Sequence, residues 1–144
     1  MTTVYIDTSA LAKWYSNESQ SERFEAFIGA QRDAAICRLT VVEFRCLLAR
    51  CRRAGDITAT LETRIGDAFA ADLASGTLTV HPVEDPDFGA AVILIRDLRK
   101  QPLRTLDALH LAVARRLDVG LVATADRVMA AACKELGIKV APFF

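Results

Sequence analysis

The sequence has no excess of charge of either sign and no long uninterrupted apolar run. Its 144 residues carry 18 basic and 18 acidic side chains, so the formal net charge is zero. A histone-like basic surface is therefore excluded, and contact with a polyanion has to rely on locally clustered arginines. Charged residues interrupt every apolar run before it reaches the about 20 residues that a membrane-spanning helix needs. We expect no membrane association.

Cysteine and histidine are scarce, and their spacing is not that of a metal-binding motif. The four cysteines contain no C-x-x-C pair, and there are only two histidines. A zinc site is therefore not indicated, and the simplest interpretation of the cysteines is buried, reduced thiols. The chain starts directly with strand-forming residues and lacks the basic and apolar segments of a secretory signal. These absences predict a protein of the cytoplasm.

The chain has the size and apolar content of one domain, which we expect to span residues 1–144. Hydrophobic residues make up 52% of it, enough to bury a core at this length. Strand-like segments are expected at 4–6, 34–39, 77–83, 120–124 and 138–141. Helix-like segments are expected at 10–15, 19–30, 44–51, 57–73, 85–98, 104–117 and 127–136. This alternation predicts an α/β fold with a parallel sheet and helices on both faces.

Four carboxylates stand where predicted strands give way to helices. They are Asp7 after the first strand, Glu43 just past the second, Asp107 in the first turn of an apolar helix, and Asp126 after the fourth strand. Because parallel strands end at the same edge of a sheet, we expect these acids to converge in one pocket. Converging carboxylates repel one another unless a cation is bound, and Mg²⁺ or Mn²⁺ suits carboxylate ligands best. Such a site is typical of phosphodiester hydrolysis.

Each acid also has a simpler interpretation as part of a helix cap. Thr40 and Glu43 fit a capping box, and Thr105 could cap the helix that carries Asp107. Asp126 suits a helix amino terminus, where a negative charge is stabilised. Capping does not require the acids to meet, so their positions in space separate the two interpretations.

Polar side chains close to the acids are further candidates for the site. Thr8, Ser9 and Thr124 could hold a carboxylate or a metal-bound water in place, although helix capping is the better interpretation for at least one of them. His110 follows Asp107 by three residues and therefore shares its helical face. We favour a structural histidine, hydrogen-bonded in the core, over a general acid.

Arginines and aromatic residues offer possible contacts to a nucleic acid. Arg45, Arg50, Arg52, Arg53, Arg104 and Arg127 lie near the acids in sequence. Some of them could hold phosphates, and the alternative is a solvated helix face with ordinary ion pairs. Trp14 and Tyr15 could stack an unpaired base, although core packing is the better interpretation for at least one of them.

Four segments of the chain resemble the signature blocks of PIN-domain ribonucleases, specifically VapC-type toxins of bacterial toxin–antitoxin pairs. They are VYIDTSAL (4–11), TVVEFRCLLAR (40–50), LRTLDALHLAVA (103–114) and LVATADRVMAAACKELGI (121–138). Each block contains one of the four acids, and together they span nearly the whole chain.

The resemblance implies a three-layer α/β/α PIN-like domain with a central, mostly parallel five-stranded sheet. It also implies that Asp7, Glu43, Asp107 and Asp126 bind Mg²⁺ or Mn²⁺, with direct or water-mediated contact left open for Asp126. The implied activity is endonucleolytic cleavage of RNA, and the implied partners are a cognate antitoxin and a second copy in a homodimer. A catalytically quiet PIN-like module that binds RNA or protein is the alternative.

Overall fold

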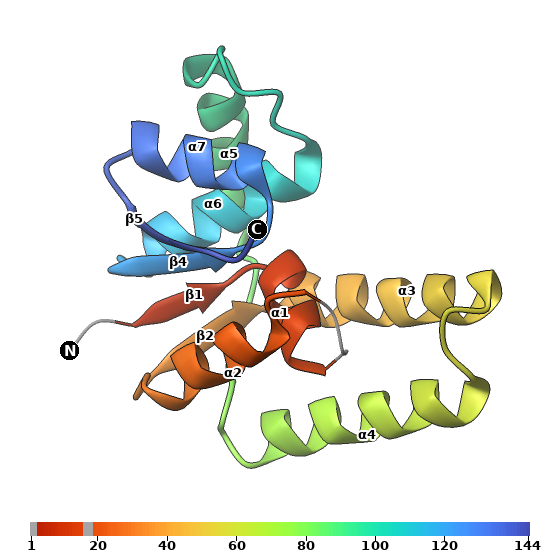
Figure 1. Ribbon diagram of the computed structural model, residues 1–144. Helices are drawn as coiled ribbons and strands as arrows, with labels where there is room; N and C mark the ends of the chain where they lie inside the picture. The colour runs from red at the N-terminus through yellow and green to blue at the C-terminus, as the bar shows by residue number, and fades with distance from the viewer. Residues whose placement is uncertain (1–2, 16–18) are drawn as a thin grey trace.

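In the computed structural model, residues 3–15 and 19–144 are described and contain a five-stranded sheet (Figure 1). The strands are β1 (Val4–Ile6), β2 (Ala34–Cys37), β3 (Thr79–His81), β4 (Leu121–Thr124) and β5 (Lys139–Pro142). All neighbouring pairs are parallel, in the order β3-β2-β1-β4-β5. The predicted five-stranded parallel sheet is confirmed. β3 is shorter than the expected 77–83, and it ends before Pro82, which has no amide hydrogen for the ladder.

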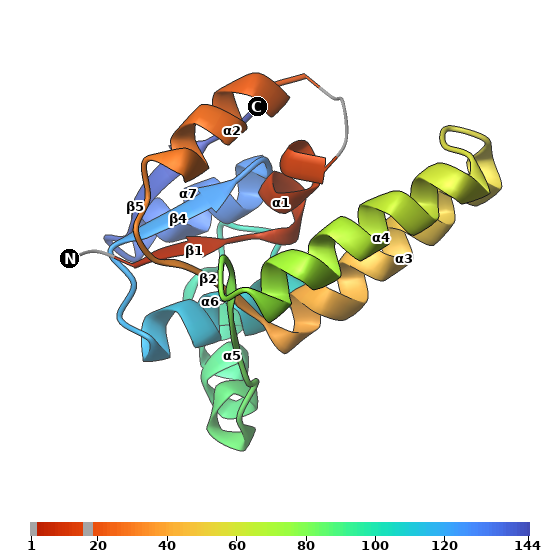
Figure 2. The same ribbon diagram turned by 90° about the horizontal axis from the view of Figure 1, so that it is seen from below.

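Helices cover both faces of the sheet, which confirms the three-layer arrangement (Figures 1 and 2). They are α1 (Thr8–Tyr15), α2 (Ser21–Gly29), α3 (Arg38–Ala54), α4 (Ala59–Ala74), α5 (Asp85–Asp97), α6 (Thr105–Arg116) and α7 (Arg127–Glu135). Alternation along β1 divides the core between the faces. Val4 and Ile6 pack with α1 to α4, whereas Tyr5 packs with α5, α6 and α7.

The order of the strands reverses at β1. The chain runs outward from β1 to β2 and β3, and later returns to place β4 on the other side of β1. In open parallel sheets such a reversal creates a crevice at the carboxyl ends of the two diverging strands. Asp7 stands at this point, and its backbone N–H donates to the carbonyl of Ala123 at 3.0 Å.

The core cluster around Val4 and Ile6 contains a group of aromatic rings between α1, α3 and α4. The ring of Tyr15 lies 5.3 Å from that of Phe44 and 5.6 Å from that of Phe69, and the Tyr15 hydroxyl donates to Asp72. Trp14 packs on Tyr15 and Phe24. Core packing is therefore confirmed for both residues, and neither lines the pocket described below. Their suggested role in stacking a base stays a prediction.

The four cysteines are free thiols, as predicted, but they are not all buried. Cys37 and Cys133 are buried, Cys51 is half-buried and Cys46 is exposed. The expectation of burial is wrong for Cys46, which lies on the solvent side of α3. Among the described residues, no helix is long and apolar enough to cross a membrane.

An ion pair that the sequence did not indicate joins α5 to α6, between the buried carboxylate of Asp87 and the solvent-exposed Arg116. Asp87 is 2% exposed, and its carboxylate accepts hydrogen bonds from Nε and Nη2 of Arg116 at 2.8 and 3.0 Å. It also accepts the backbone N–H of Glu84 at 2.8 Å, which caps α5. Burial raises the pKa of the Asp87 carboxyl, and the hydrogen bonds from Arg116 and Glu84 outweigh burial, so the pKa lies below its usual value.

Replacing Arg116 by Met should lower the free energy of unfolding by about 1–2 kcal/mol at neutral pH, because the buried Asp87 charge loses the hydrogen bonds from Arg116 while solvent partly screens the pair. The folded pKa of Asp87 is depressed in the wild type, so the pair stabilises above the unfolded pKa and this stabilisation is lost as pH falls through the folded pKa. The difference between Arg116→Met and wild type should therefore shrink in acid. Urea unfolding at pH 7 and at about pH 3, below the usual pKa of an aspartate, measures it. Arg115→Met, next to it on α6, should change stability by less than about 0.5 kcal/mol.

Candidate active site

A pocket of about 490 Å³ lies at the carboxyl ends of β1 and β4, and all four predicted acids line it. Asp7 comes from the junction of β1 and α1, Glu43 from α3, Asp107 from α6, and Asp126 from the junction of β4 and α7. The predicted convergence of the acids in one pocket is confirmed. It arises because the strands are parallel and the sheet order reverses beside Asp7.

Two hydroxyl groups hold the carboxylate of Asp7, which is 6% exposed. Ser9 Oγ and Thr124 Oγ1 each donate to Asp7 Oδ2 at 2.8 Å. Thr124 Oγ1 in turn accepts the backbone N–H of Asp126 at 3.0 Å, and Ser9 Oγ accepts that of Ala125 at 2.9 Å. The predicted role of these hydroxyls is confirmed. They fix one oxygen of Asp7 and tie it to the loop that carries Asp126.

Glu43 is held from two sides through a single oxygen. Thr8 Oγ1 donates to Glu43 Oε1 at 2.9 Å, and Nε2 of His110 contacts the same oxygen. The expected capping box of Thr40 and Glu43 is wrong, because α3 begins at Arg38 and Glu43 lies in its second turn. Thr8 therefore shares with Ser9 and Thr124 the task of holding a carboxylate.

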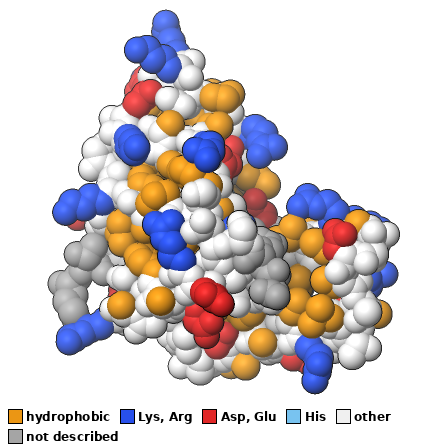
Figure 3. Space-filling model, in the orientation of Figure 1, with side chains coloured by type: hydrophobic (Ala, Val, Ile, Leu, Met, Phe, Trp, Pro, Cys, Tyr) orange, Lys and Arg blue, Asp and Glu red, His pale blue; other side chains and the backbone are white. Residues whose placement is uncertain are grey.

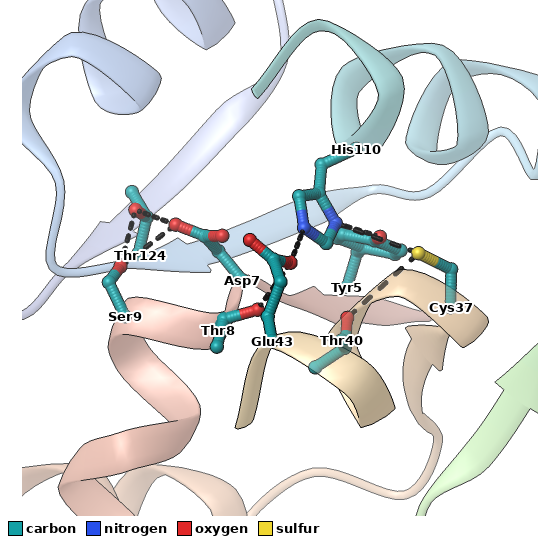
Figure 4. A network of polar contacts seen from close by, with 9 residues as sticks. All are labelled: Tyr5, Asp7, Thr8, Ser9, Cys37, Thr40, Glu43, His110 and Thr124. Atoms are coloured by element: carbon teal, nitrogen blue, oxygen red, sulfur yellow. Dashed lines mark hydrogen bonds and ion pairs between the residues drawn. The ribbon is translucent and has the colours of Figure 1, made fainter. Parts of the chain in front are cut away.

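His110 sits behind Glu43 in a buried polar network (Figure 4). It is 2% exposed, and its Nδ1 lies 2.7 Å from the hydroxyl of Tyr5 and 3.6 Å from Sγ of Cys37. The interpretation as a hydrogen-bonded core histidine is confirmed. The sequence did not indicate its contact with Glu43, although a histidine on an apolar helix requires buried partners.

Charge interactions accompany this contact. Burial lowers the pKa of His110, but hydrogen bonds with Cys37 and Glu43 outweigh burial and raise it to about 10. Burial raises the pKa of Glu43, and the hydrogen bond and charge of His110 bring it below its usual value. Both directions favour a carboxylate at Glu43 that faces a protonated imidazole.

The other two acids take part in helix starts while they face the pocket. Asp126 is the N-cap of α7, and its Oδ1 accepts the backbone N–H groups of Val128 and Met129 at 2.8 and 3.3 Å. The capping interpretation is confirmed for this residue. For α6 the expected cap Thr105 is wrong, because the helix starts at Thr105 itself and Asp107 Oδ2 accepts the N–H of Arg104 at 3.3 Å.

The donor chemistry of the pocket fits a hard divalent cation. Each of the four carboxylates uses one oxygen in the contacts above, and within residues 3–15 and 19–144 its second oxygen has no hydrogen bond. None of these second oxygens is buried, because every buried side-chain oxygen of the described residues has a partner. Burial, followed by the charges of Asp126 and Asp7, raises the pKa of Asp107. A cation would relieve that repulsion.

The acids do not form a closed ligand cage. In the described part of the chain, no three His, Cys, Asp or Glu side chains lie close enough together to hold a metal ion by themselves. Mg²⁺ does not require such a cage, because it keeps several of its waters and contacts proteins through one or two carboxylates.

Arg50 and Arg104 are the suggested arginines that line the pocket, and the exposed apolar side chains of Val42 and Leu106 lie beside them. Three others make contacts elsewhere: Arg45 to the carbonyl of Gly66, Arg52 to Glu62, and Arg127 over the ring of Phe144. On the face drawn in Figure 3, Lys and Arg side chains are scattered among apolar ones. The pocket thus combines four acids with two basic side chains at its rim.

Comparison with known proteins agrees with this geometry. The family model described as PIN domain matches residues 4–138. Ribonuclease VapC47 of Mycobacterium tuberculosis is 31% identical, covering 96% of this chain and 95% of its own. Ribonuclease VapC46 of the same species is 33% identical, covering 97% of each.

Solved structures with the same fold include VapC20 of Mycobacterium tuberculosis, described as a sarcin-ricin loop cleaving toxin. It is 20% identical, with a TM-score of 0.73 over 90% of this chain and 94% of that one. A chain of a toxin–antitoxin complex from Klebsiella pneumoniae is 16% identical, with a TM-score of 0.63 over 89% and 90%. The match across residues 4–138 and the two full-length relatives establish that this chain belongs to the PIN-domain family.

Proposed function

We propose that this protein is a divalent-metal-dependent endoribonuclease and the toxin of a toxin–antitoxin pair. The observation that carries the proposal is the meeting of four carboxylates, from four separate segments of the chain, in one pocket at the reversal of the sheet. Similarity over nearly the full length to two proteins named ribonuclease VapC supports RNA as the substrate. An RNA substrate in turn supports a cytoplasmic site of action.

Asp7, Glu43, Asp107 and Asp126 are the proposed ligands of Mg²⁺, with Mn²⁺ as an alternative. Their solvent-facing oxygens support this assignment, and Asp126 contacts the ion either directly or through water. When bound, the ion supplies positive charge that neutralises the phosphate and lowers the pKa of the attacking water. The chain's own contribution is to hold the carboxylates in place: Ser9 and Thr124 fix Asp7, and Thr8 donates to Glu43.

The rim of the pocket supplies contacts to the rest of the substrate. Arg50 and Arg104 hold phosphates on either side of the scissile bond, because guanidinium groups pair well with phosphate oxygens. Val42 and Leu106, 63% and 41% exposed, offer apolar surface to unpaired bases or ribose. A local pair of arginines also fits a protein of zero net charge. This arrangement favours single-stranded or looped RNA.

Two protein partners belong to the proposal, a cognate antitoxin and a second copy of the chain. Similarity to a chain of the Klebsiella pneumoniae toxin–antitoxin complex supports the first. The second is supported by α5, whose residues Phe88, Val92 and Ile95 recur at helical spacing and are 54%, 67% and 46% exposed. Contiguous exposed apolar residues of this kind are typical of interaction surfaces.

Incubation of the purified protein with a circular single-stranded RNA tests the activity. We expect Mn²⁺ or Mg²⁺ to support linearisation of the circle, which only an endonuclease can produce, and EDTA in excess to stop it. Intact circles at every metal concentration, together with RNA binding in a gel-shift assay, would instead identify the quiet RNA-binding module. Cleavage that continues in EDTA would contradict the metal dependence.

A further inference from the structure

His110 links the pocket to a buried network that the proposed chemistry does not itself use. Its Nε2 meets Glu43 Oε1 from one side, while Nδ1 on the other side of the ring faces the hydroxyl of Tyr5 at 2.7 Å and Sγ of Cys37 at 3.6 Å (Figure 4). Tyr5 is 1% exposed and Cys37 is fully buried. The ring is thus held between the pocket and the core cluster that contains Tyr5 and Cys37.

The contact between His110 and Glu43 fixes which ring nitrogen of His110 donates: Nε2 must carry the hydrogen. Glu43 carries an acceptor, so His110 must present an N–H from Nε2 whether the ring is neutral or protonated. In the neutral ring Nδ1 then accepts the Tyr5 hydroxyl, and in the protonated ring Nδ1–H donates to Tyr5 or Cys37. Either state holds the same oxygen of Glu43 in the same place.

The result for Glu43 is a carboxylate with a fixed orientation. Thr8 and His110 both contact Oε1, one from α1 and the other from α6, and Oε2 is left for the pocket. Glu43 stands on a long helix, and its side chain is the most flexible of the four acids because it has one more rotatable bond. A second donor from the core removes that freedom before any ligand arrives.

We propose that His110 is a positioning residue for Glu43, set in its orientation by Tyr5 and Cys37, and that it acts on cation binding only through that carboxylate. This inference rests on the proposed function, since it assigns Glu43 to the cation site. It adds residues from β1 and β2 that never touch the pocket. The expected size is that of other residues that orient metal ligands, about 10–100-fold in metal affinity.

The test is a Mn²⁺ titration of the full chain. Calorimetry and the electron paramagnetic resonance signal of free Mn²⁺ are its two readouts. His110→Leu should weaken Mn²⁺ binding about 10–100-fold. His110→Gln, whose amide can still donate to Glu43, should restore most of the affinity. Tyr5→Phe removes only the hydroxyl behind the ring, so it should fold and should lose less affinity than His110→Leu.

A double-mutant cycle separates positioning from general damage. In a Glu43→Gln background, His110→Leu should weaken Mn²⁺ binding no further, because its only route to the cation has been removed. The matched control is Val113→Ala on the same helix, a fully buried apolar position, which should lower the urea midpoint and leave Mn²⁺ affinity unchanged.

The outcomes distinguish this inference from the proposed function. Wild-type protein that takes up no Mn²⁺ overturns both. The positioning role alone is overturned if the Mn²⁺ affinities of His110→Leu and Tyr5→Phe both stay within about twofold of the wild-type affinity. It is also overturned if His110→Leu weakens Mn²⁺ binding further in the Glu43→Gln background. If His110→Leu fails to fold, Tyr5→Phe and His110→Gln decide the question. Reduced Mn²⁺ affinity in Tyr5→Phe, with most of the affinity kept in His110→Gln, supports the positioning role, and wild-type affinity in Tyr5→Phe overturns it.

Discussion

Asp7→Asn is expected to lower the rate of metal-supported RNA cleavage by about 10²–10³-fold or more, with the fold intact. Asn can still accept from Ser9 and Thr124, so the hydrogen bonds that hold the side chain survive. What is lost is the negative charge at the reversal of the sheet, where the cation is proposed to bind. Single-turnover cleavage rates, measured for both proteins at one Mn²⁺ concentration that saturates the wild type, give the effect, and urea unfolding confirms the fold.

The matched control for this substitution is Asp118→Asn. Asp118 lies ahead of β4, at the end of the sheet opposite the pocket, and its φ of 51° is one that Asn adopts as readily as Asp. The Asp118→Asn variant should cleave RNA at the wild-type rate. Equal cleavage by wild type and Asp7→Asn, both purified in the same way, would show that the activity comes from another site or from a contaminant.

Asp107→Asn is expected to lower the cleavage rate by a similar factor. In contrast, it should raise the free energy of unfolding of the metal-free protein. In the metal-free protein, burial and the charges of Asp126 and Asp7 raise the pKa of Asp107. A folded pKa above the unfolded one favours the folded state at low pH, and this contribution is lost as pH rises through the folded pKa. Asn carries no charge, so the variant should be more stable than the metal-free wild type at pH 7.

Urea unfolding in EDTA at pH 7 and at about pH 4, near the pKa of an unfolded aspartate, checks this second prediction. The advantage of Asp107→Asn should be present at pH 7 and should diminish at pH 4. Added Mn²⁺ should reverse the order at pH 7, because a ligand that binds only the folded wild type stabilises it. A variant less stable than wild type at pH 7 in EDTA would contradict repulsion within the pocket.

The sheet and the meeting of the acids were predictable from the sequence because both depend on local patterns. Short apolar segments that end on Asp7 or Asp126 mark strand ends, and parallel strands bring their ends together whatever lies between them. The hydroxyls of Ser9 and Thr124 were found for the same reason, since they are neighbours of these acids in sequence.

The start of α3 was misplaced because strand and helix compete in its sequence. Apolar residues continue past Cys37 through Leu39, and a short apolar run does not distinguish a strand from a buried helix. In the structure β2 ends at Cys37 and the helix begins at once, which moves Glu43 from a cap into the second turn. There it can reach both Thr8 and His110.

Contacts between distant segments lay beyond the sequence. His110 and Glu43 are 67 positions apart, and His110 and Tyr5 are 105 apart. Their meeting depends on how α3 and α6 sit across the sheet, which no local spacing specifies. The same holds for Asp87 and Arg116, 29 positions apart, whose helices show no matching pattern. A buried Asp87 would have required a partner, but the sequence did not show that Asp87 is buried.

The proposed function depends most directly on the uptake of a divalent cation by the four acids. Isothermal titration of metal-free wild-type protein with Mn²⁺ at neutral pH, beside Asp7→Asn and Asp118→Asn, measures it. We predict saturable binding by wild type and Asp118→Asn, and binding too weak to saturate in Asp7→Asn. Absence of binding in the wild type, or the same affinity in Asp7→Asn, would contradict the proposal that these carboxylates share a metal ion.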